Sequence, residues 1–227
     1  MKILVTNDDG WDATGIAHLS SVASQFGEVT IVAPLNPQSG VAHQLTLDRE
    51  MKFSKQGHQS YALDGTPADC VRFGLHHLEE NFDWVLSGIN QGANLGVDVY
   101  RSGTVAAARE ANFHGINAIA VSQYRSNMAA SDFDWQRSAN WCRDLLAPIM
   151  SSVPSEPQLI NINLPDGAGQ AMPEVVSCPC DTNPLSIDYS NSNGLVKFTG
   201  SFQDRPRTPG HDIDVCFGGK ISVSRLR

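Results

Sequence analysis

The sequence predicts an α/β fold, a doubly wound and mostly parallel Rossmann-like sheet with a C-terminal extended β appendage. Over residues 1–165, short apolar runs typical of buried parallel strands alternate with amphipathic segments of helical period. Over residues 166–227 the chain is rich in Gly, Pro, Asn and Ser and keeps only short alternating pieces. We therefore expect one functional unit with a core at 1–165 and a tail at 166–227. The tail either makes subunit contacts or lies as a meander on the surface.

The expected core strands are short apolar runs bounded by polar residues or glycine. They cover residues 2–6, 28–33, 84–86, 118–121 and 159–163. Residues 45–55 and 60–63 alternate more weakly and are expected to form an antiparallel excursion. In the tail, the pieces 195–199, 214–217 and 221–223 are expected to be extended.

Helices are expected between these strands, at 15–26, 66–77, 104–113 and 135–147. The first carries its apolar side chains on one face and ends at Gly27. The second begins with Thr66 as N-cap, proline at the first helical position and Asp69 in the first turn. The third is alanine-rich, and Pro148 is expected to end or kink the fourth.

The composition excludes several kinds of partner. A net charge of -8 disfavours binding to a nucleic-acid duplex, which depends on clustered Lys and Arg. No apolar stretch approaches a transmembrane span, and no signal peptide is expected because polar residues at 7–9 interrupt the first apolar run. The 5 cysteines lack framework spacing and are typical of reduced thiols. We therefore expect a cytoplasmic protein without a membrane partner.

Two adjacent carboxylates, Asp8 and Asp9, directly follow the first predicted strand. In α/β sheets, ligands bind beyond the carboxyl ends of the parallel strands. Hard carboxylate oxygens on a tight turn suit Mg²⁺ or Mn²⁺. Asp-Asp-Gly is also ordinary turn chemistry, since Asp bonds its own backbone and Gly10 supplies a positive φ. The residues of the other loops distinguish a cation site from an ordinary turn.

Three further loops place small, oxygen-rich residues at the same expected edge of the sheet. Ser39 lies in the loop after the second strand, and Asn90 and Asn94 lie in a Gly- and Asn-rich loop after the strand at 84–86. Ser102-Gly103-Thr104 precedes the alanine-rich helix, and a helix N-terminus favours anions. Each loop alone is explained by turn or capping chemistry. Together they predict that a cation and a phosphate group bind side by side.

In these stretches the chain resembles the SurE family of metal-dependent nucleotidases. The resemblance covers nearly the whole chain, at residues 3–10, 32–34, 39–40, 65–71, 87–96, 102–105 and 161–165, with a diverged match at 212–214 and 219–223. It implies a Rossmann-like core whose β tail is exchanged within a homodimer or homotetramer. The implied activity is hydrolysis of nucleoside 5′-monophosphates, and often of 3′-monophosphates, with one divalent cation (Mg²⁺ or Mn²⁺) per subunit. The cation ligands implied are Asp8, Asp9, Ser39 and Asn90, and the phosphate-binding residues are Asn94, Ser102, Gly103 and Thr104.

A few positions depart from the family pattern. Arg101 stands where the family usually has tyrosine, and it adds a cation beside the implied phosphate site. Thr14 replaces the proline of a usual Ala-Pro-Gly, and Lys220 replaces an aromatic residue near the C-terminus. The change at Lys220 bears on subunit exchange, and the change at Arg101 bears on substrate preference.

Asp8 and Asp9 are expected to be catalytic through the cation, with a water molecule attacking phosphorus in line. Attack by one of the two carboxylates, giving a phosphoaspartate, stays open. His43 is a candidate proton donor or an ordinary loop histidine, since nothing pairs it with an acid in sequence. Trp11 and Tyr100 are candidates for stacking on a base or for simple packing.

Two other classes of protein share some of these features. A receiver-like phosphoacceptor module also begins with paired acids, but it needs an Asp after a central strand and a Lys after a later one. The chain has Ser87-Gly88 and Ser122-Gln123 at those places. A nucleotide-binding protein without turnover is not distinguished from a hydrolase by sequence alone.

Overall fold

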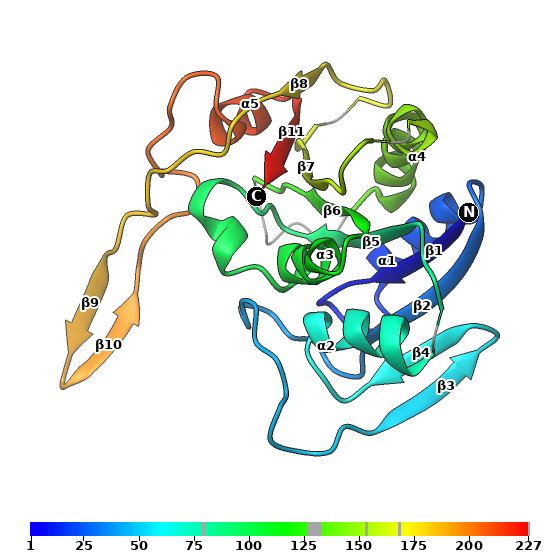
Figure 1. The fold of residues 1–227 in the computed structure, drawn as a ribbon. Helices are drawn as coiled ribbons and strands as arrows, with labels where there is room; N and C mark the ends of the chain where they lie inside the picture. Colours follow the sequence, from blue (N-terminus) through cyan, green and yellow to red (C-terminus); the bar gives the residue numbers. More distant parts are fainter. Residues whose placement is uncertain (79, 127–132, 153, 168, 227) are drawn as a thin grey trace.

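A computed structural model describes residues 1–78, 80–126, 133–152, 154–167 and 169–226, the remaining positions being too uncertainly placed to describe. Its centre is a nine-stranded sheet with the order β3-β4-β2-β1-β5-β6-β7-β11-β8 (Figure 1). The strands of this sheet are β1 (Lys2–Thr6), β2 (Glu28–Pro34), β3 (Phe53–Gly57), β4 (Ser60–Leu63), β5 (Trp84–Gln91), β6 (Asn117–Gln123), β7 (Leu159–Leu164), β8 (Val175–Ser177) and β11 (Ile221–Leu226). The helices are α1 (Thr14–Ala23), α2 (Pro67–Arg72), α3 (Gly103–Phe113), α4 (Trp135–Ser151) and α5 (Asp212–Phe217).

The central strands run parallel, which confirms the predicted fold class. Strand β1 pairs in parallel with β2 and β5, and β5, β6 and β7 continue the parallel order. Antiparallel pairing occurs only at β3 with β4 and at β11 with β7 among the pairs of this described sheet. The carboxyl ends of β1, β5, β6 and β7 therefore open onto one edge of the sheet, and the loops after them share that edge.

Helices cover both faces of the sheet, as the alternation of buried side chains along β1 requires. Ile3 and Val5 pack into the cluster formed with α1 and α4, whereas Leu4 packs into the cluster formed with α2 and α3. Successive strand side chains point to opposite faces, so a strand buried on both sides is apolar throughout. Each such side chain contributes about 1.5–3 kcal/mol when fully buried. The core thus fixes β1, which delivers the paired carboxylates to the sheet edge.

Four elements differ from the sequence-based expectations. The excursion expected at 45–55 pairs with β4 as predicted, but its strand begins only at Phe53, and residues 45–52 belong to the preceding loop. Helix α4 continues through Pro148 to Ser151, because burial of Leu146 and Met150 against the core offsets the lost backbone hydrogen bond. The piece at 214–217 was expected to be extended but belongs to α5. Strand β5 runs on to Gln91, with a shift of register between Ser87 and Asn90, so part of the expected loop lies on the strand.

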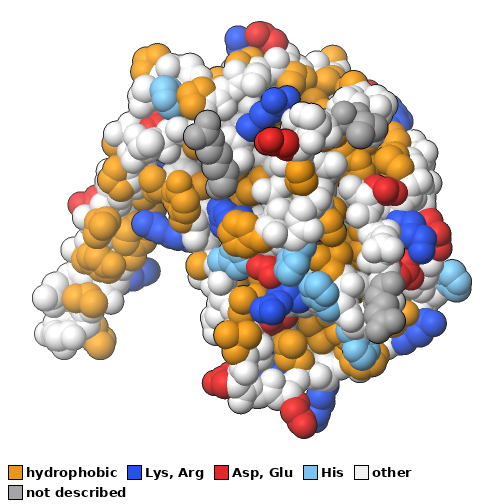
Figure 2. Space-filling view, in the orientation of Figure 1, with side chains coloured by type: hydrophobic (Ala, Val, Ile, Leu, Met, Phe, Trp, Pro, Cys, Tyr) orange, Lys and Arg blue, Asp and Glu red, His pale blue; other side chains and the backbone are white. Residues whose placement is uncertain are grey.

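The tail divides between the sheet and a separate arm. Strands β8 and β11 and helix α5 join the main body, whereas β9 (Tyr189–Ser192) and β10 (Leu195–Phe198) pair only with each other in the described chain. Asn193-Gly194 forms their turn, with positive φ at both residues as a tight hairpin requires. The hairpin stands away from the body (Figure 1), and its surface is rich in apolar side chains (Figure 2). We call residues 187–198 the arm.

Candidate functional site

The turn after β1 is built by a side chain rather than by the carboxylates themselves. Asn7 Nδ2 donates to the carbonyl oxygen of Gly10 at 2.7 Å, and the Gly10 amide donates back to Asn7 Oδ1 at 3.3 Å. Gly10 has a φ of 110°, which an L side chain rarely adopts. Because Asn7 closes the turn, Asp8 and Asp9 are released from turn chemistry and are available to a ligand.

Both carboxylates are held by donors from distant segments. Thr104 Oγ1, in the first turn of α3, donates to Asp8 Oδ1 at 2.6 Å. The Gln91 amide, at the end of β5, donates to Asp9 Oδ2 at 3.3 Å. Neither carboxylate forms an ion pair with any residue in the described part of the chain. Two acidic groups are thus gathered without a protein cation to neutralise them.

Burial makes Asp8 an unusual carboxyl group. Asp8 is 6% exposed. Burial raises its pKa, the hydrogen bond from Thr104 lowers it and the nearby charge of Asp9 raises it, and together these effects bring the pKa to about 6. Burial also raises the pKa of Asp9. Removing charged carboxylates from water costs free energy unless a cation compensates, so the pair is arranged to attract one.

Asp8 borders a polar cleft of about 320 Å³ at the carboxyl edge of the sheet. Its walls include five of the predicted site residues, namely Asp8, Ser39, Asn90, Asn94 and Ser102. Three predicted residues do not line the cleft, namely Asp9, Gly103 and Thr104. Asp9 accepts a hydrogen bond from the backbone amide of Gln91, which does line it, and the other two follow Ser102 in the first turn of α3. The structure therefore brings the predicted residues together from the loops after β1 and β2, from the end of β5 and the loop after it, and from the start of α3.

The N-terminus of α3, where the sequence predicts phosphate binding, borders the cleft through Ser102. Ser102 is the N-cap, and its hydroxyl accepts a hydrogen bond from the Val105 amide at 3.0 Å. The other amides of the first helical turn lack intrahelical partners and carry the positive end of the helix dipole. Arg101 also lines the cleft, which adds a full positive charge on the same side.

Asn94 is held by an asparagine pair on β7. The backbone carbonyl oxygen of Asn94 accepts from Asn161 Nδ2 at 2.8 Å and from Asn163 Nδ2 at 3.1 Å. Its backbone amide donates to Asn163 Oδ1 at 2.8 Å. Its own side chain donates to Ser122 Oγ at 2.8 Å. These buried bonds fix Asn94 in the loop that follows β5, and the sequence analysis did not predict this role for the two asparagines on β7.

The two aromatic candidates for base stacking lie elsewhere. Trp11 packs against the core, and Tyr100 is 71% exposed with the Arg109 guanidinium over its ring. Neither lines the cleft. The aromatic residue that does is Phe202, which comes from the tail and has no signal in the local sequence.

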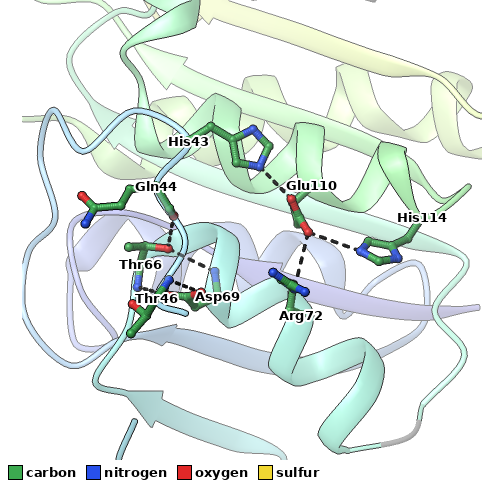
Figure 3. A network of polar contacts seen from close by, with 8 residues as sticks. All are labelled: His43, Gln44, Thr46, Thr66, Asp69, Arg72, Glu110 and His114. Atoms are coloured by element: carbon green, nitrogen blue, oxygen red, sulfur yellow. Dashed lines mark hydrogen bonds and ion pairs between the residues drawn. The ribbon is translucent and has the colours of Figure 1, made fainter. Parts of the chain in front are cut away.

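The loop at 35–52, which carries Ser39, is tied to α2 by its own backbone (Figure 3). Thr66 and Asp69 form a capping box at the start of α2. Thr66 Oγ1 also donates to the Gln44 carbonyl oxygen at 2.7 Å, and the Thr46 amide donates to both Asp69 carboxylate oxygens at 3.1 and 3.2 Å. The cap predicted from the sequence thus serves the site loop as well as the helix.

A buried carboxylate on α3 fixes the same loop from the other side (Figure 3). Glu110 Oε2 lies 2.7 Å from His43 Nε2, and its Oε1 lies 3.3 Å from His114 Nε2 and 3.7 Å from Arg72 Nε. The His43 ring also stacks on Phe113, with centroids 5.6 Å apart. His43 is therefore paired with an acid through space, which makes it a structural contact of the loop and removes it from the cleft.

We expect Glu110→Gln to lower the free energy of unfolding by about 1–3 kcal/mol, because the amide cannot replace a buried carboxylate in its contacts with His43, His114 and Arg72. Urea denaturation measures this change. The matched control is Glu174→Gln, which removes an exposed carboxylate 2.9 Å from Lys220 Nζ and should change stability by less than about 0.5 kcal/mol. Equal effects of the two substitutions would contradict the role given to Glu110.

Fold and site together define an α/β protein with a polar cleft at the carboxyl edge of a parallel sheet, where proteins of this fold class bind ligands. In the described residues no helix has the length and apolarity needed to cross a membrane. The family model described as "Survival protein SurE" matches residues 3–184. The chain belongs to the SurE family.

Several known proteins are similar along their whole length. A protein of Nostoc sp., whose name gives 5′-nucleotidase as a provisional assignment, is 43% identical over 229 residues and each chain is covered completely. The 5′-nucleotidase SurE of Citrifermentans bemidjiense is 42% identical, with 100% of this chain and 92% of that protein covered. The crystal structure of the SurE protein from Aquifex aeolicus superposes with a TM-score of 0.87 at 29% identity, covering 100% of this chain and 93% of that one. The resemblance inferred from the motifs is thereby confirmed.

Proposed function

We propose that the chain is a divalent-metal-dependent phosphomonoesterase that hydrolyses nucleoside 5′-monophosphates, with 3′-monophosphates as a second substrate class. Relatives named 5′-nucleotidase SurE support the reaction class. The observation that carries the proposal is the hydrogen bond from Thr104 to Asp8, because it fixes the anion-binding start of α3 beside the candidate cation ligands.

The residues at the cleft suit a hard cation. Asp8 and Asp9 supply carboxylate oxygens, and Ser39 supplies a hydroxyl. Asn90 Nδ2 donates to the Gly92 carbonyl at 2.8 Å, so its remaining polar atom is the amide oxygen. No group of three or more His, Cys, Asp or Glu able to hold a metal occurs among the residues that the structure describes, so amide and hydroxyl oxygens complete the set. Such all-oxygen donors are those of Mg²⁺ and Mn²⁺.

When bound, one divalent cation per subunit would polarise a phosphoryl oxygen and lower the pKa of a bound water. The protein supplies the rest of the reaction geometry. Thr104 holds the Asp8 carboxylate, and Asn94, Arg101 and the Ser102 end of α3, which line the cleft, would bind the other phosphate oxygens. In our proposal a water oxygen attacks phosphorus in line and gives up a proton to solvent, the ester P–O bond breaks, and the leaving ribose oxygen takes a proton from solvent. Trapping a phosphoaspartate on Asp8 or Asp9 would instead favour the carboxylate nucleophile.

The test is phosphate release from nucleoside 5′- and 3′-monophosphates with Mn²⁺, with Mg²⁺ and with EDTA. We expect release with either metal, its loss in EDTA and its return on adding metal back. Zinc supplied at the same concentration is a useful control for metals that prefer nitrogen and sulfur ligands. Binding of the nucleotide without release under any metal would replace the hydrolase with a nucleotide-binding protein.

We also propose that the arm joins copies of the chain into a homodimer or homotetramer. All residues of β9 and β10 are exposed, including Leu195 at 77% and Val196 at 67%. An isolated two-stranded hairpin is marginal in water, and a contiguous apolar surface marks an interface (Figure 2). A second copy of the chain is the simplest partner, because it supplies an equal arm and symmetric contacts.

Replacing both Leu195 and Val196 with Ser should convert the oligomer to a monomer in sedimentation-velocity experiments, because these side chains supply the apolar contact. The matched control is Lys197→Ser, which changes the exposed residue that follows them on the same strand and should leave the mass unchanged. A monomeric wild-type protein, or a double variant of unchanged mass, would contradict this use of the arm.

A cytoplasmic location is the third part of the proposal. All five cysteines are free thiols and four of them are buried, as is usual where the environment is reducing.

A further inference from the structure

A second, apolar hollow adjoins the polar cleft at the carboxyl edge of the sheet. It measures about 260 Å³ and is lined by Gly92, Ala93, Tyr124, Arg125, Phe202 and Gln203. Gly92, Ala93 and Phe202 line the polar cleft as well, so the two spaces share a wall. A ligand anchored by a phosphate in the first space would extend directly into the second.

The hollow is built on a small cluster of aromatic side chains outside the main core. Tyr124, directly after β6, is buried and stacks on Phe217 with centroids 4.5 Å apart. Phe202 lies 6.3 Å from the Tyr124 ring and 5.9 Å from the Phe217 ring. Buried Leu95 and Ile213 complete the cluster. An aromatic and apolar wall of this kind suits a flat, weakly polar group rather than a second anion.

The ring of Phe202 is fixed by a charge pair. The Arg205 guanidinium lies 4.5 Å from its centroid, and Arg205 Nη1 lies 2.6 Å from Asp98 Oδ2. The Arg205 side chain is fully buried and lines neither the polar cleft nor the apolar hollow. It therefore covers a part of the Phe202 ring that faces neither of them. Asp98, in turn, lines the polar cleft. Phe202 is thus held ready for a ligand and does not need to be ordered by one.

We propose that this hollow receives the base of the nucleoside monophosphate, with Phe202 as the stacking surface. The proposal rests on the proposed function, since it assumes a phosphate in the polar cleft. Stacking accepts any base because every base has a π face, and the hollow offers few polar groups for discrimination. The site therefore selects nucleotides as a class over phosphate esters without a base, and it distinguishes weakly between bases.

The experiment compares adenosine 5′-monophosphate with ribose 5-phosphate, which has the same ester and lacks the base. In Phe202→Ala, KM for adenosine 5′-monophosphate should rise about 10-fold, the usual cost of removing one base–aromatic stack, with kcat nearly unchanged. Values for ribose 5-phosphate should stay within about 2-fold. Phe202→Tyr should retain the wild-type KM. The matched control is Tyr100→Ala, which removes an exposed aromatic ring outside both spaces and should change neither substrate.

Equal losses for both substrates, or no change for either, would overturn the proposal. If the alanine variant does not fold, Phe202→Leu keeps the apolar volume without the stacking face and gives the same comparison. If the wild-type protein releases phosphate from neither compound, the proposed function fails. Calorimetric binding of adenosine 5′-monophosphate to the wild-type and Phe202→Leu proteins then still decides the role of Phe202.

Discussion

Asp8→Asn should reduce phosphate release from nucleoside 5′-monophosphates by about 1,000-fold, measured as kcat/KM at saturating Mn²⁺. The substitution keeps the shape of the side chain and its capacity to accept from Thr104, whose hydroxyl lies 2.6 Å from Asp8 Oδ1. It removes the negative charge that would hold the cation, and electrostatic terms dominate phosphoryl transfer. Asp12→Asn is the matched control, because it neutralises an exposed carboxylate nearby that does not line the cleft.

The same substitution should stabilise the metal-free protein. Burial raises the pKa of Asp8 from its ordinary value of 3.8 to about 6. The folded state therefore holds this proton more tightly than the unfolded state, and stability falls as the pH rises from about 4 to about 6. Asn removes that penalty, so we expect the metal-free variant to gain about 1–3 kcal/mol at pH 7 and nothing near pH 3.5. Thermal unfolding at several pH values measures both effects.

A loss of activity together with a gain in metal-free stability would identify Asp8 as a ligand-binding residue whose burial destabilises the empty protein. A variant that loses activity and stability together would point to a structural carboxylate. A variant that keeps its activity would remove Asp8 from the reaction. The wild-type protein in saturating Mn²⁺ should recover the stability that it lacks without metal, because a ligand that binds only the folded state stabilises it.

Local sequence patterns predicted the parts of the site that lie next to strands and helix starts. Asp8 follows β1 directly, and Ser102 directly precedes α3, so a strand or a cap identifies each of them. Parallel pairing then places both at one edge, because β1 and β5 run in the same direction. The fold class followed from the same periodicity, and the comparison with the SurE protein of Aquifex aeolicus bears it out.

The parts that could not be predicted come from the tail. Phe202 reaches the cleft from more than a hundred residues beyond Asn94, and Arg205 finds Asp98 across a similar separation. No periodicity or capping pattern encodes such a contact. The α5 segment was misassigned for a related reason: apolar and acidic residues alternate there as they would in a strand. Burial of Ile213 and Cys216, three residues apart, in the cluster with Leu95 favours the helix instead.

Gly103→Ala should lower kcat/KM about 100-fold although no charged or polar group is removed. The backbone at the start of α3 lies close against the Asp8 side chain: a Cβ atom on Gly103 would lie 2.9 Å from Asp8 Cβ, 3.1 Å from Asp8 Oδ2 and 3.1 Å from Pro67 Cγ. Real contacts at Cβ are almost never shorter than 3.0 Å, so the start of α3 would have to move away from Asp8. That movement would separate Thr104 Oγ1 from the carboxylate, and a displacement of about 1 Å can cost about 100-fold in rate.

The stability of this variant separates the geometric effect from general damage. Overpacking one methyl group costs about 1–3 kcal/mol, which should leave the protein folded at 25 °C. Gly57→Ala is the matched control, since its added Cβ would meet only Ser60 Cβ at 3.9 Å on the exposed strand β3. We expect weaker Mn²⁺ binding in Gly103→Ala and unchanged binding in Gly57→Ala. If Gly103→Ala keeps both its Mn²⁺ affinity and its kcat/KM within about 3-fold, the close approach of α3 to Asp8 does not set the geometry of the reaction.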